Sequence, residues 1–372
     1  MPSLSSGDME NMLLDSVVDE MAKETEANNP NDKRSDKEHV RDLPFFENES
    51  TEAPRKQKFQ MGCKEVFGIT IPKGLPNVPV TVFKKGDWDK DMQSHIPEID
   101  KNYQFQPKQL IELLVGLNLN DNVWISGATG SGKSSLVEQV CAYTNRPFAR
   151  INGRGDMESG AIFGQYVLED GKTIWKDGVC TEAVKNGMVY CQDEPTVLPP
   201  EIAMGYQWLL ENGGKLMLTD KAGDTKDKLV SPHKHFRFVC CDNTKGLGDE
   251  MGAFAGTNVW NTATLDRFST SIQLDYLPKN KEVEVIKAKC PNITEKLASY
   301  MVQFAGLVRI AYAQGNVSFT MSPRTLLSWG EKALYYKDIN QALKSSYYSK
   351  LPNDIEKVAI EEMFATVFAK RL

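Results

Sequence analysis

Residues 123–135 constrain the fold more than any other part of the chain. Their sequence, VWISGATGSGKSS, places an apolar strand before the pattern G-x-x-x-x-G-K-[ST] at 127–134, and a helix-forming stretch follows at 136–140. Glycines let such a loop curl so that successive N–H groups point inward at the positive end of the following helix. The order of strand, loop and helix therefore predicts an α/β protein that binds a nucleoside triphosphate.

The loop supplies the candidate contacts to the nucleotide. Lys133 is predicted to reach the β- and γ-phosphates of ATP, and the Ser134 hydroxyl is predicted to bind Mg²⁺. The complete set of loop residues expected to contact ATP is Gly127, Ala128, Thr129, Gly130, Ser131, Gly132, Lys133, Ser134 and Ser135.

An apolar strand at 188–192 ends in two acids, Asp193 and Glu194. Asp193 is expected to hold Mg²⁺, usually through water, and Glu194 to polarise the attacking water. Acid pairs also end strands by chance, but the position downstream of a phosphate-binding loop favours the catalytic interpretation. Gln192 is unusual, because the residue at this position is usually apolar.

Three polar residues farther along the chain are further candidates. Asn243, which comes after an expected strand at 236–241, is predicted to orient the lytic water, although Asn also ends strands merely to start a turn. Arg267 suits the charge that spreads over the phosphoryl oxygens in the transition state, and the alternative is local pairing with Asp266. Arg324 begins a helix and is predicted to contact phosphate, and the alternative is an ordinary surface arginine.

Composition divides the chain into two unlike parts. Residues 1–58 hold 14 acidic and 8 basic residues, which leaves 36 of each sign in the remainder and assigns the net charge of −6 to this segment. Its low hydrophobicity predicts disorder. Residues 12–21 within it have helical apolar spacing, and a docking helix and a fraying helix of no consequence are equally supported.

Four segments are expected from this pattern. The acidic tail covers 1–58, and an extended, proline-containing segment covers 59–107. Strands and helices then alternate over 108–278, as in a parallel sheet with helices on both faces. After Pro278 helical periodicity continues, which predicts a small all-helical domain at 279–372. The sequence Asp170-Gly171 predicts a hairpin within 165–175.

Seven cysteines without C-x-x-C spacing indicate a reducing compartment. Neither a signal peptide nor an apolar run of 18 residues is visible, so a cytoplasmic protein with no membrane contact is expected. The balanced charge of residues 59–372 gives no overall argument for nucleic-acid binding, although a local basic stripe stays possible. His233 and His235 form an H-x-H pair, for which a solvated hairpin is favoured over a metal site.

The motifs together carry a resemblance to a known family. Their order along the chain is GATGSGKS (127–134), QDE (192–194), DNT (242–244), LDRF (265–268) and SPR (322–324). This order resembles the MoxR-type branch of the AAA+ ATPases. The segments FGI (67–69), TKGLGD (244–249), YLPKNKEV (276–283) and MSPRT (321–325) extend the resemblance to the ATPase subunits of aerobic cobaltochelatase, the CobS-like proteins, some of which are encoded by bacteriophages.

The resemblance implies an ATPase that assembles into a homo-oligomeric ring, usually a hexamer. Arg267 would then reach the γ-phosphate bound by the neighbouring subunit. Partners would be a protein with a von Willebrand-type metal-ion domain and a chelatase-like subunit. The hairpin at 165–175 would face the ring centre or a partner, while packing is the favoured interpretation for Trp175.

Two other functions remain open at this point. Some AAA+ relatives move nucleic acid, which requires a basic stripe or pore. ATP could also lock a structural assembly without turnover, but the pair Asp193-Glu194 disfavours this, because a clamp gains nothing from a carboxylate that activates water.

Overall fold

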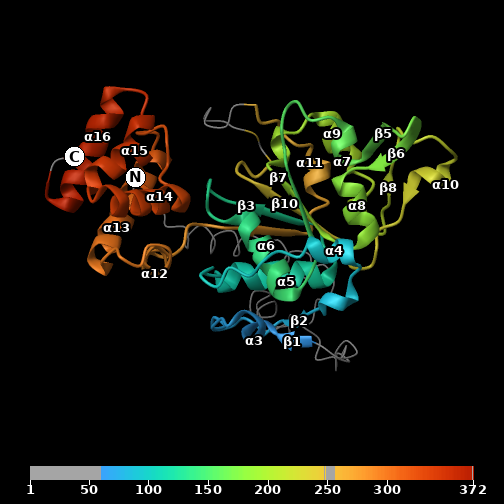
Figure 1. The fold of residues 1–372 in the computed structure, drawn as a ribbon, viewed down its shortest axis with the longest axis horizontal. Helices are drawn as coiled ribbons and strands as arrows, with labels where there is room; N and C mark the ends of the chain where they lie inside the picture. Colours follow the sequence, from blue (N-terminus) through green and yellow to red (C-terminus); the bar gives the residue numbers. More distant parts are fainter. Residues whose placement is uncertain (1–59, 247, 249–255, 371) are drawn as a thin grey trace, which may run out of the picture. The chain divides into compact units, whose positions relative to one another are not determined.

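The computed structural model describes residues 60–246, 248, 256–370 and 372. The acidic segment 1–58 and the helix expected at 12–21 lie outside the described residues, as does part of 244–249. The described chain forms an α/β core followed by a set of helices, the lid (Figure 1).

A five-stranded parallel sheet lies at the centre of the core. Its strands are β3 (Val123–Ser126), β4 (Phe148–Asn152), β7 (Val189–Asp193), β10 (Arg237–Asp242) and β11 (Thr270–Gln273). Their order across the sheet is β11-β3-β10-β7-β4, and every neighbouring pair is parallel. The predicted α/β fold with a parallel sheet is confirmed. The carboxyl ends of β3, β7 and β10 meet at one edge, and this arrangement positions the site.

Alternate residues of the strands pack on opposite faces of the sheet, as the two-residue repeat of a strand requires. Ile125 and Cys191 pack with α5 (Pro107–Leu119) and α6 (Lys133–Thr144) on one face. The neighbouring residues Trp124, Tyr190 and Phe238 pack on the other face. That face is covered by α8 (Val179–Asn186) and α9 (Pro200–Gly205), so the inner strands β3, β7 and β10 are buried on both sides (Figure 1).

The helix α9 on this face is short. It ends at Gly205, and residues 206–210 continue as hydrogen-bonded turns. Glycine loses more backbone freedom in a helix than any other residue, which favours an end at this point. The ring of Phe163 also lies 2.7 Å from the position that a Cβ at residue 205 would take.

The predicted hairpin forms from β5 (Gly164–Glu169) and β6 (Lys172–Asp177). Asp170 and Gly171 connect the strands, with φ angles of 51° and 72°. Positive φ at both positions is typical of the tight turn that suits the twist of a hairpin. Trp175 is partly buried against the core and meets the Tyr166 ring edge-on, in agreement with the packing interpretation.

Shorter elements complete the core. They are β1 (Gln60–Gly62), α3 (Cys63–Phe67), β2 (Pro79–Thr81), α4 (Lys90–Ser94), α7 (Ser159–Ile162), β8 (Leu216–Met217), α10 (Thr225–Lys228), β9 (Leu229–Val230) and α11 (Thr262–Leu265).

The prediction of a solvated hairpin around His235 is wrong. Its ring is partly buried and packs 4.9 Å from the Phe83 ring and 5.9 Å from the Trp88 ring, measured between centroids.

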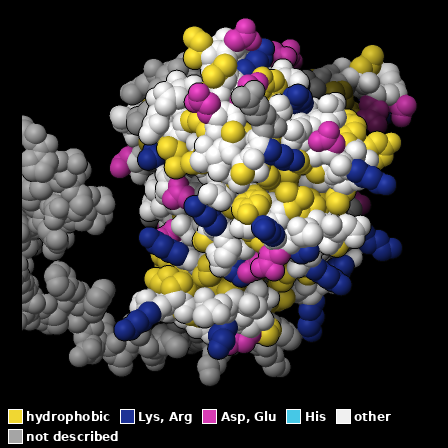
Figure 2. Space-filling model, turned by 90° about the vertical axis from the view of Figure 1, so that its left-hand side faces the viewer, with side chains coloured by type: hydrophobic (Ala, Val, Ile, Leu, Met, Phe, Trp, Pro, Cys, Tyr) yellow, Lys and Arg dark blue, Asp and Glu magenta, His cyan; other side chains and the backbone are white. Residues whose placement is uncertain are grey.

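The lid consists of α12 (Lys279–Lys289), α13 (Glu295–Ala313), α14 (Pro323–Tyr336), α15 (Ile339–Ser346) and α16 (Asp354–Phe368). It has a hydrophobic core of its own, in which the Phe304 ring contacts the rings of Trp329 and Phe364. On the face drawn in Figure 2, hydrophobic side chains lie between separate Lys and Arg side chains. None of the helices in the described part of the chain combines the length and apolarity of a bilayer-spanning segment.

Candidate nucleotide-binding site

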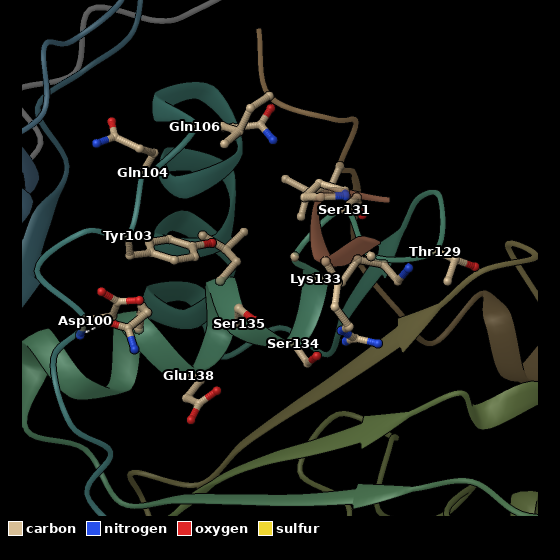
Figure 3. A pocket seen from close by; sticks show the side chains of 18 of the residues that line it. Asp100, Tyr103, Gln104, Gln106, Thr129, Ser131, Lys133, Ser134, Ser135 and Glu138 are labelled. Carbon is tan, nitrogen blue, oxygen red and sulfur yellow. Dashed lines mark hydrogen bonds between the residues drawn. The ribbon is translucent and has the colours of Figure 1, made fainter. Parts of the chain in front are cut away.

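A cavity of about 770 Å³ opens at the carboxyl end of the sheet. Its size falls within the range of roughly 300–1,000 Å³ that is common for small-molecule sites. It is lined by loop residues 129–135, by Asp193, Glu194 and Asn243, and by Arg324 from the lid. Figure 3 shows Lys133 and Ser134 on one side of this cavity and Tyr103 beside the start of α6.

The phosphate-binding loop holds Lys133 in a confined position. The side chain is 7% exposed, and its Nζ donates hydrogen bonds to the Gly127 and Ala128 carbonyls at 2.8 and 3.2 Å. A third bond of 2.7 Å goes to Oδ1 of Asn243. Burial lowers the pKa of the ammonium, and the nearby acids, Asp193 among them, oppose that change.

The two acids at the end of β7 have separate partners. Asp193 pairs with the guanidinium of Arg150 from the adjacent strand β4. Glu194 accepts a hydrogen bond of 3.3 Å from Nδ2 of Asn243. Asn243 thus lies between Lys133 and Glu194 and contacts both, because β10 lies between β3 and β7 in the sheet.

The backbone at Glu194 has an uncommon conformation. Its φ and ψ are 50° and 54°, in the left-handed region that non-glycine residues rarely adopt. The Gly153 N–H donates a bond of 2.7 Å to the Asp193 carbonyl. A Cβ at residue 153 would lie 2.2 Å from the carbonyl oxygen of Glu194. Gly153 therefore permits the close approach that holds this turn, and such strain is common at functional sites.

The lid reaches the same cavity through the start of α14. Ser322 caps this helix by accepting a bond from the Thr325 N–H, and Arg324 lies in its first turn. The loop and the lid approach closely, because a Cβ at Gly130 would lie 2.6 Å from the Cβ of Ser322. Gly130 also has a φ of 74°. Both the close contact and the positive φ therefore favour glycine at position 130.

Arg267 does not line this cavity. Its guanidinium pairs with Glu211 and also donates to the Ala263 carbonyl. The local pairing with Asp266 that was weighed from sequence is replaced by this pair with Glu211. Arg267 and Glu211 line a second cavity, of about 590 Å³, outside the first one.

Sequence reasoning missed several residues that line the first cavity. Arg150 and Asn152 come from β4, and Tyr103 and Gln106 come from the extended segment before α5. The two-residue spacing of Arg150 and Asn152 on a strand was a usable signal, since such residues share a face. The extended segment carries no periodicity that could have indicated a site.

The residues present suit a magnesium nucleotide. The cavity combines an ammonium, a hydroxyl, carboxylates and the N-terminus of the 12-residue helix α6, which together suit phosphate and Mg²⁺. The Ser131 hydroxyl is also buried without a hydrogen-bond partner in the structure. A buried polar atom of this kind calls for a ligand or water to satisfy it.

Comparison with known proteins agrees with this geometry. The family profile described as "AAA domain (dynein-related subfamily)" matches residues 122–268. The aerobic cobaltochelatase subunit CobS of Sinorhizobium sp is 32% identical over 320 residues, which cover 84% of this chain and 91% of that protein. The chain belongs to the dynein-related, MoxR-type branch of the AAA+ ATPases. The resemblance expected from the motifs is confirmed, and membership of this family implies that the chain binds ATP.

Two further proteins match at lower sequence identity. Midasin of Dictyostelium discoideum is 27% identical over 251 residues, which cover 65% of this chain and 4% of midasin. The Holliday junction branch migration motor RuvB of Thermotoga maritima aligns in structure with a TM-score of 0.42 at 14% identity, covering 67% of this chain and 72% of RuvB.

Proposed function

We propose that this AAA+ protein hydrolyses Mg²⁺·ATP in the 770 Å³ cavity and uses the cycle to remodel a partner complex. The observation that supports the proposal is the convergence of Lys133, Asp193, Glu194 and Asn243 at the carboxyl edge of the sheet. Asn243 contacts both Lys133 and Glu194. The groups that bind phosphate and activate water therefore lie within one hydrogen-bonded set.

Each group has a defined task in this proposal. The loop N–H groups and Lys133 bind the phosphates, so Lys133 exchanges its carbonyl partners for phosphate oxygens. Ser134 and Asp193 would hold Mg²⁺, which neutralises charge on the phosphates. Glu194 accepts the proton of the water that attacks the γ-phosphorus, and Asn243 orients that water.

We also propose that the active form is a ring with ATP between subunits. Arg267 lies in a separate cavity from the loop of its own chain, which suits a guanidinium that serves a neighbouring site. Arg324 approaches from the lid of the same chain. The partner complex would be chelatase-like, since CobS matches over most of its own length.

Substitution of Glu194 by Gln tests the proposed hydrolysis. The variant is expected to bind ATP like the wild type and to turn over at least ~100-fold more slowly, because loss of a general base typically costs 10²–10⁴ in rate. Glu201→Gln is the matched control, since this exposed acid lies seven positions farther along the same segment. A Glu194→Gln variant with unchanged turnover would remove Glu194 from the reaction.

A further inference from the structure

Beside the phosphate-binding loop lies a compact cluster of linker and lid residues that the proposed reaction does not use. Its members are Tyr276, Glu282, Arg309, Thr320 and Met321. Tyr276 belongs to the linker between β11 and α12, and the other four belong to the lid.

Arg309 and Glu282 form the fixed part of this cluster. The two guanidinium NH₂ groups of Arg309 donate to the two carboxylate oxygens of Glu282, both at 2.8 Å. The side chains are 13% and 3% exposed. A two-pronged pair of this kind fixes orientation as well as position. Arg309 Nε also donates to the Met321 carbonyl at 2.8 Å, so α12, α13 and the segment before α14 are joined.

Tyr276 connects this pair to the phosphate-binding loop. The guanidinium carbon of Arg309 lies 4.0 Å from the centroid of the Tyr276 ring, which is a close cation–π contact. The Tyr276 hydroxyl donates to the Thr129 carbonyl at 3.0 Å and lies 3.4 Å from the Thr320 hydroxyl. One phenol therefore contacts the loop at its hydroxyl and the lid at its ring face.

The lid end of this connection adjoins Arg324. Met321, held by Arg309, is followed directly by Ser322, which caps α14 and packs against Gly130. Arg324 is two positions farther on and lines the nucleotide cavity. Direct contacts therefore lead from the Thr129 carbonyl to Met321, and the first turn of α14 continues from there to Arg324.

We propose that Tyr276 is a positioning residue that transmits the conformation of the phosphate-binding loop to Arg324. The inference rests on the proposed function, because it assumes that Arg324 contacts the γ-phosphate. The Arg309–Glu282 pair holds the Tyr276 ring in a fixed position relative to the lid. The hydroxyl bond to Thr129 then holds Arg324 at the distance from the loop that a third phosphate requires.

The test is a double-mutant cycle on nucleotide affinity, measured by fluorescence titration with ATP and ADP under non-hydrolysing conditions. Tyr276→Phe keeps the ring under Arg309 and removes only the hydroxyl. We expect ATP affinity to fall roughly three- to tenfold, the range for one lost hydrogen bond, and ADP affinity to change less than about twofold. In an Arg324→Ala background the same substitution should have almost no effect, because the two residues act in series.

Tyr348→Phe is the matched control, since it removes a hydroxyl that pairs with Glu361 on the exposed surface of the lid. Equal losses for ATP and ADP, full additivity with Arg324→Ala, or unchanged affinity in Tyr276→Phe would each overturn the inference. A wild-type protein that binds ATP without hydrolysing it would contradict the proposed function and leave this measurement readable.

Discussion

Asn243 connects the lysine of the phosphate-binding loop to the acid at the end of the next strand. It accepts a bond of 2.7 Å from Lys133 and donates one of 3.3 Å to Glu194. The amide has both an acceptor and a donor, so its orientation is set by these two neighbours of opposite charge. Asn243 can therefore contact the water that Glu194 deprotonates. The amide does not itself take up the proton of that water.

We expect Asn243→Ala to lower kcat by roughly 100-fold with little change in ATP affinity, because a lost donor near developing charge typically costs 10²–10³ in rate. Steady-state ATPase kinetics and nucleotide titration measure the two effects. Asn152→Ala, at the end of β4 in the same cavity, is the comparison. A loss confined to ATP affinity would show that Asn243 acts on binding alone.

Arg150 forms an ion pair with the Asp193 carboxylate, which is also the proposed ligand of Mg²⁺. The ratio of the ATP affinity with Mg²⁺ to that without Mg²⁺ should therefore rise roughly tenfold in Arg150→Gln. The reason is that the guanidinium no longer competes with Mg²⁺ for the Asp193 carboxylate. Without nucleotide the substitution should lower the free energy of unfolding by about 1 kcal/mol, because the buried Asp193 loses its ion-pair partner. Titrations in Mg²⁺ and in EDTA, together with urea unfolding, measure these effects.

Arg154→Gln is the control for this prediction. Arg154 lies in the loop after β4 and pairs with Asp156 at 3.5 Å, with both side chains largely exposed. If both variants shifted the Mg²⁺ dependence equally, the contact between Arg150 and Asp193 would have no role in metal binding.

Arg267 and Glu194 should complement each other between subunits. Arg267→Ala and Glu194→Gln are each expected to abolish turnover. In a head-to-tail ring each site takes Glu194 from one subunit and Arg267 from its neighbour. When equal amounts of the two variants are mixed, roughly a quarter of the interfaces should contain both native residues and regain activity. ATPase measurements over a series of mixing ratios check this. Lys133→Ala mixed with Glu194→Gln should stay inactive, because both changes damage the site of their own subunit.

Lys133, Asp193, Glu194 and Asn243, which line one cavity, each lie in a segment with a strong local signal in the sequence. The strand at 123–126 has the expected bounds in the structure. Asp193 and Asn243 come together because parallel strands place their carboxyl ends at one edge. The spacing of Arg150 and Asn152 indicates a shared face of one strand, but the contact of Arg150 with Asp193 depends on β4 lying beside β7. That adjacency is a property of sheet order, to which residues far apart in the chain contribute.

The burial of His235 likewise depends on residues that are far away in the sequence. The alternation of polar residues around it suggests a solvated turn, but residues 83 and 88 return from the extended segment and cover its ring. Nothing local to residues 233–235 indicates that contact. The resulting burial has a measurable consequence for the pH dependence of stability.

Burial lowers the pKa of His235 from 6.5 to about 4, and the cations Arg146, His233, Lys234 and Arg237 act in the same direction. The unfolded chain therefore binds a proton that the folded chain excludes between these values. The stability associated with neutral His235 is fully present above pH 6.5 and is lost as the pH falls toward 4.

His235→Phe should reduce this acid sensitivity, because it keeps an aromatic ring against Phe83 and removes the titrating group. After allowance for solvent screening of a partly exposed ring, we expect the loss of unfolding free energy between pH 7 and 4.5 to shrink by about 1 kcal/mol. Urea unfolding at several pH values measures it. Parallel pH profiles for the variant and the wild type would mean that the ring at position 235 is solvated, and that the aromatic cluster with Phe83 does not form in solution.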